Sequence, residues 1–286
     1  MFMEMWGGSD MIHNKSAKYA LLMGICLLVF SGPRARAYTM PAPGDFIDTA
    51  QKTEVDCDAI RSGRTMVALV FGQSNSANHG ETRYMPRGNV YNFFDGKCYK
   101  ATDPMLGATG DRGSVWSRLG DKLIDAGLYD NVIFISIGVG GTEIRRWTVN
   151  GDLHRRIVDV VHQLKKEKMK ITHVFWHQGE SDASRKTTKD EYKSMFMAML
   201  EKMRKYGIDA PIYVAVATRC GSGAPGYEIQ QAQRELVNTD LEIFPGPYTD
   251  EITGIEDRHD ACHFSDRGLD KHADMWLRAV MFTEKK

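Results

Sequence analysis

The sequence predicts an α/β fold in three layers, an α/β/α sandwich with a central parallel sheet. Short apolar runs rich in strand-forming residues lie at 66–71, 132–137, 173–176 and 212–217. Between them lie longer segments whose apolar residues recur at helical spacing. Strands that alternate with helices form parallel sheets that are covered on both faces. We therefore expect one such domain over residues 38–286.

The helical segments are predicted from apolar stripes and from residues that cap helices. They are expected at 114–127, after Asp152, at 190–207, around 229–236, and after Ser265 or Asp266 as the cap of the last helix. Gly127 and Gly207 are typical helix stops. Methionines at helical spacing in the third segment are interpreted as core residues.

Residues 1–37 have the pattern of a secretory signal that follows a short N-terminal extension. Lys15 and Lys18 precede an apolar run at 19–30, and Ala35-Arg36-Ala37 provides a cleavage site. About twelve apolar residues are too few to span a bilayer; the alternatives are an uncleaved anchor or a buried helix. We expect a secreted or periplasmic protein, free of the membrane after cleavage. The formal net charge of zero gives no reason to expect nucleic acid as a partner.

Export changes the interpretation of the cysteines. Beyond the signal the chain retains Cys57, Cys98, Cys220 and Cys262, an even number that fits an oxidising compartment. None has the C-x-x-C spacing of a zinc or redox site. Of the three possible connectivities, proximity in sequence favours Cys57–Cys98 and Cys220–Cys262.

The polar residues at the strand ends predict one site, because ligands of parallel sheets bind beyond the carboxyl ends of the strands. These segments are 72–75, 138–144 and 177–182, joined by 257–265 before the last helix. In the first of them, Ser74 is either a nucleophile or an ordinary turn residue. The dinucleotide, phosphate-loop and G-x-S-x-G motifs do not occur, so no cofactor is expected.

Four blocks in these segments resemble the SGNH hydrolase superfamily, and in particular its sialate O-acetylesterase and acetylxylan-esterase branch. The blocks are Gly72-Gln-Ser-Asn75, Gly140-Gly141, His177-Gln-Gly-Glu180 and Asp260-Ala-Cys-His263. Gln178 stands where the wider superfamily has asparagine, as it does in the carbohydrate-esterase branch. The resemblance implies a flavodoxin-like sheet and a serine esterase that removes acetyl groups from carbohydrate, either polysaccharide or sialic acid.

Ester cleavage by this route needs a nucleophile, a base and an acid that orients the base. The resemblance implies Ser74 as nucleophile and His263 as the base. Two carboxylates compete to orient His263. Asp260 has the D-x-x-H spacing and is favoured, while Glu180 arrives from the neighbouring strand end and otherwise braces the loops of the site.

Further roles follow from the same blocks. The N–H groups of Ser74 and Gly141 and the side-chain amide of Gln178 are expected to form the oxyanion hole. The candidates for substrate contact are Asn75, Arg145 and Trp147. For the last two, the alternative is a solvated charge and a packed aromatic ring.

Other functions remain open on sequence grounds. His79, His177 and His259 lie in or beside these blocks and could form a metal cluster with Glu180 and Asp182. Their spacing matches no standard metal motif, so no metal is expected. Within the superfamily the alternative is a lipase- or thioesterase-like hydrolase. Outside enzymes it is a glycan-binding protein that keeps the fold without catalysis.

Overall fold

A computed structural model describes residues 43–221 and 225–284, so the predicted signal segment lies outside the described residues. An eight-stranded sheet runs through the described part in the order β1-β4-β3-β5-β2-β6-β7-β8. Its strands are β1 (Glu54–Val55), β2 (Thr65–Gly72), β3 (Val90–Phe94), β4 (Lys97–Lys100), β5 (Asn131–Ser136), β6 (His173–His177), β7 (Ile212–Val216) and β8 (Ile243–Tyr248).

The predicted parallel sheet is confirmed, because the neighbouring strands β3, β5, β2, β6, β7 and β8 all pair in parallel. At one edge the sheet is mixed, because β4 pairs antiparallel with both β3 and β1. Across the sheet, the strands lie in the order β5-β2-β6-β7-β8. Numbered by their sequence, these five strands have the flavodoxin order 2-1-3-4-5. The chain order reverses at β2, and a ligand crevice is expected at its carboxyl end.

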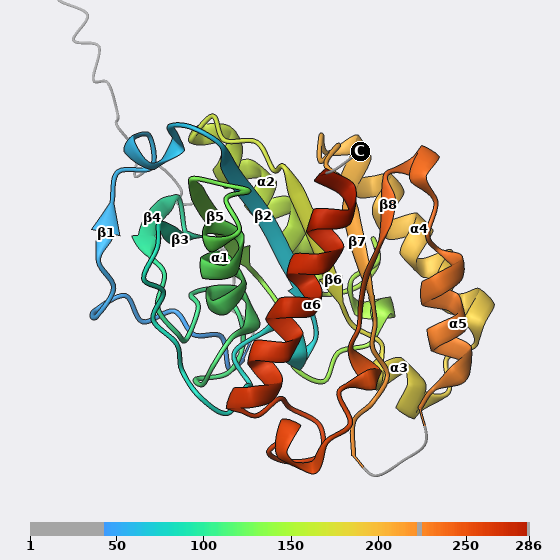
Figure 1. The fold of residues 1–286 in the computed structure, drawn as a ribbon. Helices are drawn as coiled ribbons and strands as arrows, with labels where there is room; N and C mark the ends of the chain where they lie inside the picture. Colours follow the sequence, from blue (N-terminus) through green and yellow to red (C-terminus); the bar gives the residue numbers. More distant parts are fainter. Residues whose placement is uncertain (1–42, 222–224, 285–286) are drawn as a thin grey trace, which may run out of the picture. The chain divides into compact units, whose positions relative to one another are not determined.

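Helices cover both faces of this sheet (Figure 1). They are α1 (Val115–Asp125), α2 (His154–Lys166), α3 (Glu180–Arg185), α4 (Lys189–Lys205), α5 (Tyr227–Glu235) and α6 (Asp266–Glu284). Side chains of α1 and α6 pack on one face, and those of α2, α4 and α5 pack on the other. The predicted helices are all present, whereas the short α3 was not predicted.

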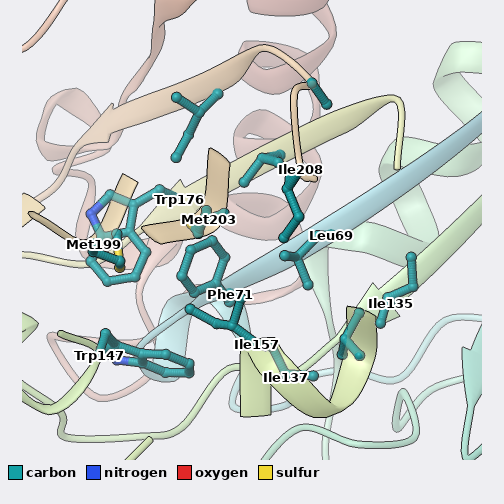
Figure 2. Packing of buried hydrophobic residues seen from close by; sticks show 14 of the residues in the cluster. Leu69, Phe71, Ile135, Ile137, Trp147, Ile157, Trp176, Met199, Met203 and Ile208 are labelled. Carbon is teal, nitrogen blue, oxygen red and sulfur yellow. The ribbon is translucent and has the colours of Figure 1, made fainter. Parts of the chain in front are cut away.

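Strand β2 shows why the sheet needs both layers. Alternate residues of β2 enter the two cores: Val67, Leu69 and Phe71 on one side, and Met66, Ala68 and Val70 on the other. Figure 2 shows the first of these cores, where the ring of Phe71 lies edge-on to Trp147 and Trp176 with centroids 5.3 and 4.7 Å away. A strand that is apolar on both faces is stable only when both are covered.

Local signals fix the helix ends. The hydroxyl of Ser114 accepts a hydrogen bond from the backbone N–H of Trp116 and caps α1. At the start of α4, Thr188 and Glu191 form a reciprocal capping box. The last helix begins at Asp266, so Ser265 is the predicted cap that directly precedes it.

Two disulfides confirm the predicted pairing. Cys57–Cys98 ties the segment after β1 to β4, and Cys220–Cys262 ties the segment after β7 to the loop that holds His263. None of the helices in the described residues is both long and apolar enough to cross a membrane.

Candidate active site

The turn after β2 places Ser74 at the edge of the sheet. Gly72 has a φ of 133°, and a Cβ there would lie 2.1 Å from the carbonyl oxygen of His177 on β6. Only glycine permits this backbone conformation and this approach of the two strands. Ser74 then opens a short 3-10 turn, Ser74–Ser76, and lies on the wall of a pocket.

Two asparagines hold this turn against other segments of the chain. The Asn75 amide donates to Glu180 Oε1 over 2.8 Å and to the carbonyl oxygen of Cys262 over 3.4 Å. Asn78 donates to the carbonyl oxygen of Met105 over 2.9 Å and accepts from its N–H over 2.7 Å. The turn that holds Ser74 is thus braced from both sides. Asn75 is 7% exposed and braces the loops instead of lining the pocket.

The loop before α6 holds the histidine and its acid. Nδ1 of His263 lies 2.7 Å from Oδ2 of Asp260. The other oxygen, Oδ1, accepts the N–H groups of Cys262 over 3.0 Å and His263 over 2.7 Å. Partial burial raises the pKa of Asp260, but the hydrogen bonds from His263 and Cys262 outweigh it and hold the pKa well below its usual range. Asp260 is therefore ionised beside the imidazole.

One pocket of about 910 Å³ brings the predicted blocks together. Ser74, His263 and Gly141 all line it, as do Glu180 and the disulfide Cys220–Cys262. With Nδ1 engaged by Asp260, Nε2 is the nitrogen of His263 left for proton transfer. The pocket therefore combines a hydroxyl, an imidazole with an ionised carboxylate partner, and a loop of two glycines.

The glycine loop, which contains Gly140 and Gly141, follows β5. Gly141 has a φ of 68°, and a Cβ there would meet open space. The left-handed backbone conformation therefore accounts for glycine at this position.

Gln178 lies behind the pocket wall in this structure. Its amide nitrogen donates to the carbonyl oxygen of Thr142 over 3.0 Å and to Asp182 Oδ2 over 2.5 Å. Thr142 follows Gly141 directly, so Gln178 braces the glycine loop. The oxyanion role remains a prediction, because it requires the amide to exchange one of these contacts.

The two predicted contacts beyond the glycine loop lie differently. Trp147 is fully buried, packs on Phe71 and donates its N–H to Thr142 Oγ1 over 3.2 Å. This is the packed-aromatic alternative, and we assign Trp147 to the core. Arg145 is exposed and pairs with the buried Glu143, whose other oxygen lies 2.6 Å from Arg185 Nε. Of these two arginines, Arg185 lines the pocket.

Glu180 is a buried carboxylate at the base of the site. One oxygen accepts from Asn75, while Oε2 has no hydrogen-bond partner among the described residues. Burial raises its pKa to about 7. His177 Nε2 lies 3.9 Å from Oε1 and 3.2 Å from Thr249 Oγ1, and burial lowers the pKa of His177 to about 3. His177 is a hydrogen-bonded core residue.

Several pocket residues were not predicted. Gln73 Oε1 accepts the N–H of Ser181 over 3.0 Å and so fixes the start of α3. Thr109 and Asp111 reach the pocket from the glycine-rich segment 107–113. That concentration of glycines before a helix was the one available signal, since no strand end marks this loop.

Three residues of the loop before α6 offer atoms that could serve as ligands of one metal ion. One ligand atom each of His259, Asp260 and His263 lies within 4.8 Å of the others. The Nε2 of His259 lies 3.2 Å from the carbonyl oxygen of His79, and His263 already pairs with Asp260. In this structure, Nε2 of His259 and Nδ1 of His263 are thus both engaged with oxygen atoms of the protein.

Comparison with known proteins agrees with this geometry. A family model described as carbohydrate esterase, sialic acid-specific acetylesterase, matches residues 64–281. No curated protein matches the chain. A solved protein of Arabidopsis thaliana superposes with a TM-score of 0.63 at 16% identity, covering 77% of this chain and 98% of that one. For NanS the TM-score is 0.57 at 15% identity, with 78% and 98% covered. At such identities these structures show a shared fold.

Proposed function

Because the chain belongs to the carbohydrate esterase family of sialic acid-specific acetylesterases, and is thus a carboxylic ester hydrolase, we propose that it removes O-acetyl groups from carbohydrate by serine catalysis. Ser74 is the nucleophile, His263 the base and Asp260 the acid that orients it. The observation that supports this assignment most is the pairing of Asp260 with His263, which lines the same pocket as Ser74.

The reaction follows from these atoms. Ser74 Oγ attacks the acetyl carbonyl carbon while His263 Nε2 takes the hydroxyl proton. The carbonyl oxygen becomes an oxyanion, which the N–H groups of Ser74 and Gly141, and Gln178 if its amide turns inward, stabilise. The C–O bond to the sugar then breaks, and His263 returns the proton to the sugar oxygen. Water, activated by the same histidine, attacks the acetyl-enzyme and releases acetate.

Export is the second part of the proposal. Two disulfides fit a protein that folds in an oxidising compartment. Together with the signal pattern at 1–37, which lies outside the described residues, they support a secreted or periplasmic enzyme that meets its carbohydrate outside the cytoplasm.

The decisive experiment pairs two serines of one turn. Ser74→Ala should lower kcat for p-nitrophenyl acetate by several orders of magnitude with little change in thermal midpoint. Ser76→Ala is the matched control. Ser76 Oγ is buried without a hydrogen-bond partner among the described residues, and Ser76 does not line the pocket. The control should retain its activity. A Ser74→Ala enzyme with more than about a tenth of wild-type activity would refute serine catalysis.

The substrate is tested with the active enzyme. Acetylated xylan, acetylated pectin fragments and O-acetyl sialic acid should release acetate faster than esters of long-chain fatty acids. The reverse ranking would favour the lipase-like alternative. Binding of these glycans without release of acetate would favour a glycan-binding protein.

A further inference from the structure

A second histidine, His79, contacts both the loop before α6, which holds His263, and Thr109, which binds the glycine loop. We propose that His79 is a positioning residue, which holds the base His263 and the glycine loop at Gly140 in fixed register through Thr109. This inference rests on the proposed function, since it assumes that His263 is the base and that the oxyanion forms at the glycine loop.

The first set of contacts joins His79 to the histidine loop. Its ring stacks on that of His263, with centroids 5.3 Å apart and planes inclined by 23°. The carbonyl oxygen of His79 lies 3.2 Å from Nε2 of His259, in reach of a hydrogen bond. Ring and backbone of one residue thus hold both ends of the segment from His259 to His263.

The second set joins His79 to the glycine loop. Nε2 of His79 lies 3.1 Å from Thr109 Oγ1, and the same oxygen accepts the N–H of Gly140 over 2.8 Å. Since Oγ1 already accepts from Gly140, its single proton is free to be donated to Nε2 of His79. A Cβ on Gly140 would lie 3.0 Å from that Nε2, so glycine leaves room for the contact.

The charge state of His79 suits this place. Burial, followed by the neighbouring His263, lowers the pKa of His79 to about 4. The ring therefore stays neutral when His263 takes a proton from Ser74. A second positive charge stacked on the imidazolium would oppose that transfer, whereas a neutral ring supports His263 without repulsion.

The bridge links two events of one step. Proton transfer to His263 and growth of the oxyanion at the glycine loop occur together, so the distance between the two groups must match the transition state. Loss of the bridge leaves both groups present but less well placed. We therefore expect a loss in kcat, with KM nearly unchanged.

Four variants of the full chain, assayed with p-nitrophenyl acetate, test the bridge. Thr109→Val removes the hydroxyl at similar size, whereas Thr109→Ser keeps it. His79→Phe keeps an aromatic face but has no nitrogen, and His79→Ala loses both. Thr109→Val and His79→Phe should each lower kcat about tenfold to a hundredfold, with KM within about twofold, and His79→Ala should lose at least as much. Thr109→Ser should restore most of kcat.

The double variant His79→Phe with Thr109→Val gives the decisive comparison. If one bridge is at work, its kcat should lie close to that of Thr109→Val. That change already removes both contacts of the bridge, to His79 and to Gly140, so His79→Phe then removes no further contact of the bridge. Multiplicative losses would overturn the proposal. Equal losses of kcat in Thr109→Val and Thr109→Ser, or a kcat within twofold of wild type in His79→Ala, would also overturn it. The same holds if active-site titration shows that the lower kcat comes only from a smaller fraction of active enzyme. If the His79 variants do not fold, the Thr109 pair alone decides.

Failure of this proposal is distinct from failure of the proposed function. Ser74→Ala assayed alongside reports on serine catalysis alone. An inactive Ser74→Ala enzyme together with unaffected His79 and Thr109 variants leaves the esterase mechanism intact and removes only the bridge.

Discussion

Nδ1 of His263 lies 2.7 Å from Oδ2 of Asp260, within a loop of four residues. The second carboxylate oxygen of Asp260 accepts two backbone N–H groups of the same loop, so the acid is fixed before the histidine pairs with it. Glu180, the other candidate, is instead held by Asn75 and has a pKa raised by burial to about 7. An acid that orients an imidazolium must be ionised, and Asp260 satisfies this condition better.

The first prediction compares the two carboxylates. Asp260→Asn should lower kcat by up to about 10⁴, because an amide in place of the acceptor favours the wrong imidazole tautomer. Glu180→Gln, which is equally isosteric, should cost far less because Glu180 braces a turn. Steady-state kinetics with p-nitrophenyl acetate measures both. If Glu180→Gln is the more damaging change, the triad is Ser74, His263 and Glu180.

The second prediction concerns Gln178. Gln178→Ala should lower kcat by about 10²–10³ with little change in KM, as expected for loss of an oxyanion donor. The thermal midpoint is measured as well, since the amide also braces Thr142 and Asp182. An increase in KM with kcat intact would assign Gln178 to substrate binding. An unchanged kcat with a lower midpoint would leave it only the bracing role seen in the structure.

Much of this site could be predicted because parallel sheets concentrate function at strand ends. Ser74 and Gly141 both follow strands whose apolar runs are visible in the sequence, and the D-x-x-H spacing placed Asp260 beside His263. What could not be predicted depends on contacts between distant segments. Thr109 reaches the pocket from a loop that no strand end marks.

The same limit applies to the fold. The edge strands β1 and β4 are two and four residues long, too short for their pattern to stand out. Trp147 shows the limit for side chains, since an aromatic residue beside the glycine loop reads equally as a ligand contact or a core residue. Only its packing against Phe71 decides for the core.

The third prediction concerns the close approach of β2 and β6. Gly72→Ala should destabilise the protein by more than about 3 kcal/mol, because the new Cβ would meet the His177 carbonyl oxygen at 2.1 Å in a backbone conformation that alanine disfavours. Gly96→Ala is the control, with a φ of 75° and open space around its Cβ. It should cost only the backbone strain, about 1–2 kcal/mol. Similar losses in urea unfolding would show that the steric contact relaxes.

The fourth prediction follows from the raised pKa of Glu180. The buried native carboxyl keeps its proton up to about pH 7, whereas the unfolded one loses it near its usual pKa of 4.5. The native state thus binds more protons in this window, and the contribution of Glu180 to stability falls as the pH rises from 4.5 to 7.

Glu180→Gln removes this dependence. The stability of the wild type relative to Glu180→Gln should therefore decrease by up to a few kcal/mol between these pH values. Urea unfolding of both proteins across the range measures the difference. His79 and His177, whose lowered pKa values act in the opposite direction, are present in both proteins, so their effect cancels. Parallel curves would contradict the buried ionisation.

The last prediction separates the two disulfides. They close loops of nearly equal length, with sequence separations of 41 and 42, so the chain-entropy account gives them similar contributions of about 2–4 kcal/mol. Replacing either pair by alanine should therefore lower stability by similar amounts. The pairs differ in position, because Cys262 lies between Asp260 and His263 on the pocket wall, whereas Cys57–Cys98 ties the antiparallel edge of the sheet.

The two double variants should consequently differ in activity. Without Cys220–Cys262 the histidine loop loses its covalent link to the segment after β7, and kcat should decrease at least tenfold, since a small misplacement of a catalytic base is costly. The Cys57→Ala, Cys98→Ala enzyme should keep its kcat when assayed below its unfolding transition. Both are measured with p-nitrophenyl acetate at a temperature where circular dichroism shows them folded. Equal losses of kcat would show that the Cys220–Cys262 bridge stabilises the fold without positioning His263.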